Sequence, residues 1–205
     1  QRNLLDLFEK LEIPLLKVLS DMERTGIKID LQFLKNLGAN IKKDIKIISS
    51  DIYQLSNQKF NLNSPQQLQE VLFNDLKINS VGIKKTKTGL STASEQLDKI
   101  RDLHPIIPLI QNYRELKKLS STYIESLPQL VNTKTNRIHS NFNQTITVTG
   151  RLSSSDPNLQ NIPARTELGR QIRQAFVAGK EKYLLSLDYS QIELRLLAHI
   201  SEDEA

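Results

Sequence analysis

The sequence predicts an α+β protein in which a long helical part is followed by a shorter part that contains strands. Apolar residues recur at helical spacing from Leu4 to Leu127, whereas they alternate with polar residues between Ile138 and Val148. The change of period falls near Asn132, in the turn-forming sequence NTKTN. A chain of 205 residues is long enough for one large domain or two small ones.

The composition is that of a globular protein. Hydrophobic residues make up 38% of the chain and charged residues 25%, which is ordinary for this class. The absence of cysteine excludes disulfides and thiolate metal sites. No apolar run approaches the roughly 18 residues of a membrane span, so we expect a cytoplasmic protein without a membrane partner.

Residues 1–23 predict helices. Six apolar residues keep helical spacing there, and Pro14 predicts the start of a second short helix. Gly26 predicts the end of that helix, and the sequence IKID at 27–30 predicts a brief extended segment. The six residues are Leu4, Phe8, Leu11, Leu15, Val18 and Met22.

Two long antiparallel helices are predicted within residues 24–131. Asp30 is the expected N-cap of the first, whose apolar stripe covers 31–55 without a break of phase. The second helix is predicted by the apolar spacing of 106–127. We expect the pair to form a stalk.

A small tip is predicted between the two long helices. Ser64 and Pro65 have the cap and first-turn signature of a helix, and Thr92 with Glu95 predicts a capping box for another. Between them we expect a flexible basic loop. Its lysines, which would either contact phosphates or lie free in solvent, are Lys84, Lys85 and Lys87.

Residues 132–205 predict strands, loops and one amphipathic helix. Residues 138–148 alternate as in a strand, and 150–163 predict a polar loop. Residues 183–188 (YLLSLD) are apolar on both faces and predict a central strand. The helix that follows has an apolar face expected to point inward, formed by Ile192, Leu196, Leu197 and Ile200.

Asp188 stands at the end of this predicted central strand. A carboxylate held there by a rigid backbone would suit a hard cation such as Mg²⁺, which takes one or two carboxylates together with waters and substrate phosphates. The position also suits a helix N-cap, formed by Asp188 or Ser190. The residues alone leave both interpretations open.

Positive charge and polar side chains gather before Asp188. Between Asn132 and Arg173 there are six cations and two anions, which favours an anionic partner. Gly150 frees the backbone beside Arg151, and the polar side chains suit sugar, phosphate and minor-groove atoms, where readout largely ignores sequence. A solvated loop held by turns around Asp156 is the alternative. These polar side chains are Ser153, Ser154, Asn158, Gln160 and Asn161.

Two long motifs in the chain, FNQTITVTGRLSSSDPNLQNIP and DYSQIELRLLAH, resemble the family A DNA polymerases of the bacterial polymerase I type. They occur in the order and separation found in that family. The helical part resembles the family's thumb in ERTGIKID, FNLNSPQQL, STASEQL and YRELKKLSSTY. The resemblance covers essentially the whole chain. It implies a helical connector at 1–23, a thumb at 24–131, and at 132–205 the first part of a palm, with an incomplete sheet, that ends after the first catalytic motif.

The resemblance also implies roles for individual residues. Asp188 matches the first catalytic aspartate, which binds both Mg²⁺ ions, and the main-chain carbonyl of Tyr189 matches a further metal ligand. Glu193 matches the residue that leaves no space for a 2′-OH and so selects deoxynucleotides. Arg151 matches the arginine at the minor-groove edge of the primer end. Gln160, Asn161 and Arg165 match duplex contacts, and the residue patterns add Asn158, Lys84, Lys85 and Lys87 to the DNA-binding set.

The implied activity is template-directed DNA synthesis by a longer parent protein, through two-metal phosphoryl transfer. The implied partners are primer-template duplex and deoxynucleoside triphosphates, and we expect a monomer at the bacterial nucleoid. The family's fingers helix and second catalytic acid do not occur in these 205 residues, so we expect the fragment to be inactive alone. One alternative is a non-catalytic duplex-binding clamp in which Asp188 only caps a helix. Another is a single-subunit RNA polymerase, which Glu193 and TGRLSS disfavour.

Overall fold

One long helix opens the described part of the chain, which comprises residues 4–87 and 89–202 of a computed structural model. Its consecutive segments are α1 (Leu5–Leu7), the π-helical turn η1 (Phe8–Glu12) and α2 (Ile13–Thr25). The prediction that a second helix starts near Pro14 is confirmed, since α2 begins at Ile13, but η1 joins it to α1 without a break because the backbone is right-handed helical at both junctions. Pro14 lies in the first turn of α2, where a missing N–H is tolerated. Gly26 ends α2 as predicted, with φ of 59°.

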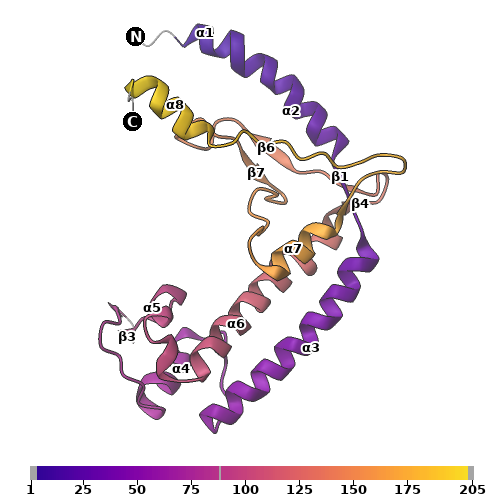
Figure 1. Ribbon diagram of the computed structural model, residues 1–205. Helices are drawn as coiled ribbons and strands as arrows, with labels where there is room; N and C mark the ends of the chain where they lie inside the picture. Colours follow the sequence, from indigo (N-terminus) through magenta and orange to yellow (C-terminus); the bar gives the residue numbers. More distant parts are fainter. Residues whose placement is uncertain (1–3, 88, 203–205) are drawn as a thin grey trace.

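The two long helices lie side by side as a stalk (Figure 1). Asp30 caps the first, since its Oδ1 accepts a 2.8 Å hydrogen bond from the Phe33 amide. Gly38 allows the close approach of the second, because a Cβ there would lie 2.7 Å from Cγ2 of Ile124. The stalk elements are α3 (Leu31–Ser56), α6 (Ile106–Leu119), its π-helical continuation η4 (Ser120–Ile124) and the 3-10 helix η5 (Leu127–Leu130).

Two apolar clusters confirm that the stalk helices are antiparallel. Near the tip, Ile52 at the end of α3 is buried in one cluster with Ile106 at the start of α6. Near the opposite end, Leu34 at the start of α3 is buried in another cluster with Leu119 at the end of α6. Burying each such side chain contributes about 1.5–3 kcal/mol, so the clusters stabilise the stalk along its length.

The tip of the stalk is a helical unit that carries a hairpin. Ser64 caps its first helix, accepting a 3.4 Å hydrogen bond from the Gln67 amide. The expected basic loop instead contains two short paired strands, with Lys85 opposite Leu90. The tip elements are α4 (Pro65–Gln69), the π-helical turn η2 (Glu70–Asp75), β2 (Lys85–Thr86), β3 (Gly89–Leu90), α5 (Ser94–Asp98) and the 3-10 helix η3 (Arg101–Leu103).

The capping box predicted at Thr92 and Glu95 does not form. The N-cap of α5 is Ala93, and no side chain caps this helix. The Thr92 hydroxyl is used elsewhere, since its Oγ1 lies 3.3 Å from Nη2 of Arg114. A charged donor forms a stronger hydrogen bond than a backbone amide, so the tertiary contact replaces the local cap.

A four-stranded antiparallel sheet joins the stalk to the rest of the chain. Its strand order is β4-β5-β1-β8, so the strand that precedes α3 is internal. Ile27 pairs with Ile138, which is fully buried, and Lys28 pairs with Val177. The sheet thus takes strands from both sides of the change in pattern near Asn132. Its elements are β1 (Ile27–Ile29), β4 (Val131–Asn132), β5 (Arg137–Ile138) and β8 (Phe176–Val177), with α7 (Glu167–Gln174) before β8.

A second, two-stranded sheet follows, and it is shorter than the alternating pattern predicts. Strand β6 (Asn141–Asn143) pairs with β7 (Ser153–Ser155), so Phe142 lies opposite Ser154. The prediction of one strand through Val148 is wrong, and Ile146 and Val148 are exposed. The prediction of a loop over Ser153–Ser155 is also wrong. Hydrogen bonds to a partner, rather than alternation, set the length of a strand.

The central strand predicted at residues 183–188 does not form. Within residues 4–87 and 89–202 no strand pairs with this segment, and its apolar side chains are exposed. Helix α8 (Ile192–Ser201) follows, and its apolar face is exposed rather than inward. An apolar run indicates that both faces of a segment favour burial, but a strand also requires hydrogen bonds to a neighbouring backbone. No helix in the same described ranges has the length and apolarity needed to cross a membrane.

Candidate nucleic-acid interface

Asp188 lies in solvent just before α8. Its carboxylate has neither a hydrogen bond nor an ion pair among the described residues. Tyr189 beside it is also exposed. In the part of the chain that the structure describes, no group of three or more His, Cys, Asp or Glu is placed to hold a metal ion. The alternative role as a helix cap is not realised, because the N-cap of α8 is Gln191 and no side chain caps it.

Arg151 and Glu193, predicted from two separate motifs, meet in the structure. Nη2 of Arg151 donates a hydrogen bond to Oε1 of Glu193, which forms an ion pair. Both side chains are largely exposed, at 70% and 71%. The contact brings the loop around Arg151 against the first turn of α8, a helix that begins four residues after Asp188.

The loop that follows β7 is organised around the buried side chain of Ser154. Its Oγ accepts hydrogen bonds from the amides of Leu159 at 3.1 Å and Gln160 at 3.4 Å. The same hydroxyl donates to Oδ1 of Asn158 at 3.1 Å. Ser154 was predicted only as one of several polar loop residues, but it holds the backbone of the others in place.

Asn158 and Gln160 use part of their side chains inside this loop. Oδ1 of Asn158 accepts a 3.0 Å hydrogen bond from the Gln160 amide, and Nε2 of Gln160 donates to the Leu152 carbonyl at 3.0 Å. Both side chains nevertheless lie at the surface. The side chains of Asn161 and Arg165 are exposed and have no partner among the described residues. These two therefore remain open to a ligand.

Sequence reasoning missed several residues that anchor the loop. The Ser140 hydroxyl lies 2.7 Å from the Pro157 carbonyl, and the Tyr123 hydroxyl donates to the Asn161 carbonyl. Glu23 of α2 accepts a 2.6 Å hydrogen bond from the Phe142 amide through Oε1. No local pattern identifies these contacts, because each joins residues that are distant in the sequence.

An ion pair follows the loop at the start of α7. Glu167 accepts hydrogen bonds from Arg170, at 2.6 Å from Nη2. The hydrogen bond and then the charge of Arg170 lower the pKa of the Glu167 carboxyl below its ordinary value. Arg170 also donates to the carbonyl of Arg165 at 3.0 Å, which ties the end of the loop to the helix.

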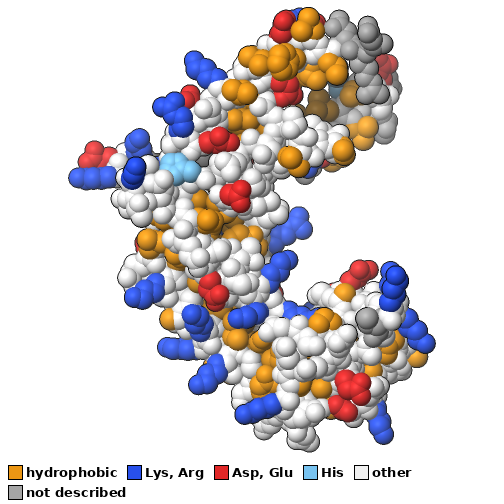
Figure 2. All heavy atoms as spheres, turned by 180° about the vertical axis from the view of Figure 1, so that it is seen from behind, with side chains coloured by type: hydrophobic (Ala, Val, Ile, Leu, Met, Phe, Trp, Pro, Cys, Tyr) orange, Lys and Arg blue, Asp and Glu red, His pale blue; other side chains and the backbone are white. Residues whose placement is uncertain are grey.

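The tip lysines lie far from the other predicted site residues. Lys84, Lys85 and Lys87 are exposed, and Lys85 is in β2. Figure 1 shows the tip hairpin and α8 at opposite ends of the molecule. The space-filling view shows a curved outline, with Lys and Arg side chains spread along the stalk between the two ends (Figure 2). The structure therefore separates the predicted contacts into two groups rather than one site.

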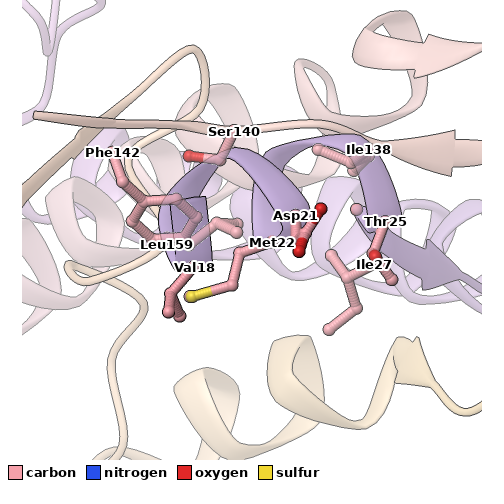
Figure 3. A pocket seen from close by; sticks show the side chains of 10 residues that line it. Val18, Asp21, Met22, Thr25, Ile27, Ile138, Ser140, Phe142 and Leu159 are labelled. Atoms are coloured by element: carbon pink, nitrogen blue, oxygen red, sulfur yellow. The ribbon is translucent and has the colours of Figure 1, made fainter. Parts of the chain in front are cut away.

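An apolar pocket of about 520 Å³ lies between α2 and the strands β5 and β6 (Figure 3). Val18 and Met22 line it from the helix, and Ile138 and Phe142 line it from the strands. Asp21 is its one charged lining residue. None of the sequence-predicted site residues lines this pocket, so it is not part of the candidate interface.

Comparison with known proteins identifies the family. The model of "DNA polymerase family A" matches residues 31–205. The thermostable DNA polymerase I of Thermus thermophilus is 51% identical over 100% of this chain and 24% of its own length. DNA polymerase I of Bacillus subtilis (strain 168) is 50% identical over 98% of this chain and 23% of its own length. The chain thus spans about a quarter of the length of these curated relatives.

A solved structure has the same fold. The POL domain of Pol1 from M. smegmatis, in complex with DNA primer-template and dNTP, matches with a TM-score of 0.87 and 40% identity. The match covers 98% of this chain and 35% of that one. Sequence and structure agree with the two motifs on which the resemblance was based, and the chain belongs to DNA polymerase family A.

Proposed function

We propose that the chain is part of a DNA-directed DNA polymerase, which performs template-directed DNA synthesis by two-metal phosphoryl transfer. The proposal rests on the likeness of this chain to a polymerase domain in complex with DNA primer-template and dNTP, which it matches with a TM-score of 0.87. In this proposal residues 1–23 are a connector, 24–131 the thumb and 132–205 the first part of the palm. The parent is a monomer of the bacterial cytoplasm, at the nucleoid.

Asp188 and the main-chain carbonyl of Tyr189 are the Mg²⁺ ligands in this proposal. Carboxylate and carbonyl oxygens fit the ion in kind, and waters and substrate phosphates would supply its other ligands. The exposed Asp188 carboxylate has no partner among the described residues, which supports a role toward a ligand. A pair of such ions would activate the primer 3′-OH and neutralise the triphosphate. A second acid must come from elsewhere in the parent, so this chain alone does not catalyse.

Glu193 and Arg151 act at the nucleotide sugar and at the primer end. Their ion pair supports a common site, because it brings the two side chains together from separate motifs. A guanidinium has five N–H donors, so the contact with Glu193 leaves Arg151 able to donate to minor-groove acceptors. In this proposal the Glu193 side chain occupies the space that a 2′-OH on the nucleotide sugar would need.

The remaining contacts hold the duplex without reading its sequence. Asn161 and Arg165 offer free side chains, whereas Asn158 and Gln160 act through the shape of the loop and their remaining amide atoms. Lys84, Lys85 and Lys87 contact phosphates at a distance from the chemistry, and such contacts weaken with salt. The curved outline in Figure 2 supports a duplex lying between the two groups.

The test is to substitute Asp188 in the polymerase that contains this chain. Asp188→Ala should abolish primer extension with Mg²⁺ and leave the affinity for primer-template nearly unchanged. Glu181→Ala is the matched control, since Glu181 is an exposed carboxylate in the same segment, and it should retain both properties. Retained extension by Asp188→Ala would favour the non-catalytic clamp. Robust extension by the pure 205-residue chain would contradict its proposed inactivity.

A further inference from the structure

Tyr123 connects the stalk to the loop that carries the proposed duplex contacts. It belongs to η4, its side chain is buried in the cluster that includes Leu34 and Leu119, and the residue is only 7% exposed. Its hydroxyl reaches out of this cluster and donates a hydrogen bond to the main-chain carbonyl of Asn161. A rigid part of the thumb-like stalk thus holds the backbone of a residue whose side chain is free.

In the described part of the chain, the other hydrogen bonds of residues 157–162 join them to residues in or beside β6 and β7, and not to the stalk. Ser154 binds the amides of Leu159 and Gln160, and Ser140 approaches the Pro157 carbonyl. Among the described residues, the bond from Tyr123 is the one hydrogen bond that joins the stalk to residues 157–162. Without it, the far side of the loop would be held to the stalk by packing alone.

A cleft of about 510 Å³ marks the same junction. Lys118 and Thr122 line it from the stalk, and Asn158 and Asn161 line it from the loop. The two walls come from parts of the chain that the Tyr123 hydroxyl links, so this bond fixes the spacing between them. A tyrosine hydroxyl is protonated and able to donate at neutral pH, and burial raises the pKa of the Tyr123 hydroxyl further.

We propose that Tyr123 is a positioning residue, which latches residues 157–162 to the stalk and so fixes the direction of the Gln160 and Asn161 side chains. The latch itself rests on geometry alone, while its effect on DNA rests on the proposed function. Because of this latch, a tilt of the stalk also moves the loop. The contact of the stalk with a duplex and the position of the loop therefore change together.

The test compares two tyrosines that make the same kind of bond. Tyr123→Phe keeps the buried ring and removes only the hydroxyl. Tyr53→Phe is the matched control, because its hydroxyl also donates to a main-chain carbonyl, that of Phe60 at 3.1 Å, but at the tip of the stalk. Amide hydrogen exchange of residues 158–162 in the full-length protein that contains this chain should become about five-fold faster in Tyr123→Phe, the effect of one lost hydrogen bond. Tyr53→Phe should leave it unchanged.

A second measurement separates the latch from the proposed function. In the polymerase that contains this chain, Tyr123→Phe should raise the Kd for primer-template about five-fold with little change in kcat, and Tyr53→Phe should change neither. Unchanged exchange in Tyr123→Phe, or an equal effect of Tyr53→Phe on residues 158–162, would overturn the latch. Faster exchange together with no duplex binding by the wild-type protein would uphold the latch and refute the proposed function.

Discussion

The guanidinium of Arg151 donates a hydrogen bond to the carboxylate of Glu193, although the two residues lie 42 positions apart in the chain. Their side chains are 70% and 71% exposed. Water and salt therefore screen the attraction between them, so the pair can open when either side chain meets a ligand. The contact brings the two side chains together while both stay accessible to solvent.

This exposure predicts a small contribution of the ion pair to stability. Arg151→Ala and Glu193→Ala should each change the free energy of unfolding by less than about 1 kcal/mol, and their double-mutant cycle should give a coupling below about 1 kcal/mol. Urea denaturation of the four proteins measures both quantities. A coupling that is large and insensitive to salt would show that the pair is buried in solution.

Substitution of Gly26, at the junction of α2 and the sheet, should have a much larger effect on the free energy of unfolding. Its φ is +59°, and a Cβ there would lie 2.4 Å from the Ile138 carbonyl oxygen. Gly26→Ala should lower the free energy of unfolding by about 2–4 kcal/mol, through backbone strain and a clash. Gly82→Ala is the control: φ is +82° but nothing lies within 4 Å, so about 1 kcal/mol is expected. Equal losses in thermal or urea unfolding would contradict the clash.

Removal of the Asp30 cap at the start of α3 should cause a moderate loss of stability. Asp30→Ala removes the acceptor of the Phe33 amide and should lower the free energy of unfolding by about 1 kcal/mol. Asp51→Ala, an exposed acid within the same helix, should stay within about 0.5 kcal/mol of the wild type. Chemical denaturation distinguishes the two, and an equal effect would mean that charge rather than capping is responsible.

Glu167 predicts a local pH dependence. The hydrogen bond and charge of Arg170 lower its pKa below the ordinary 4.5, so the contact is fully present above that value and is lost as pH falls through the lower, folded-state pKa. An NMR titration of the Glu167 carboxyl should therefore show a lowered midpoint. Arg170→Gln should raise it toward the ordinary value, whereas Arg173→Gln on the same helix should leave it in place.

Much of the helical part could be predicted, because the signals that define a helix are local. Asp30 lies next to the helix that it caps, and Gly26 lies at the end of the one that it terminates. Apolar spacing likewise identified Leu34 and Ile52 as core residues. Where a distant partner intervened, the same reasoning failed: Thr92 does not cap α5, because Arg114 uses its hydroxyl.

The candidate site was predicted as a set of residues, but its arrangement was not. Both long motifs were recognised from the chain, and with them Asp188, Arg151 and Glu193. The contact between the last two and the link from Tyr123 to the loop join residues 42 and 38 positions apart. The bonds of Ser154 are local, to residues four to six positions away, but they depend on a loop conformation rather than on a repeating pattern. No periodicity carries such information.

The sequence by itself determined the long helices, the caps at Asp30 and Ser64 and the family, since these depend on neighbouring residues and on long motifs. Only the tertiary structure decided which segments are strands and which side chains meet. Residues 183–188 have the composition of a buried strand yet pair with no strand in the described ranges, whereas the short β1 becomes an internal strand of its sheet. The reason is that a helix satisfies its backbone within itself, while a strand depends on another backbone brought alongside it.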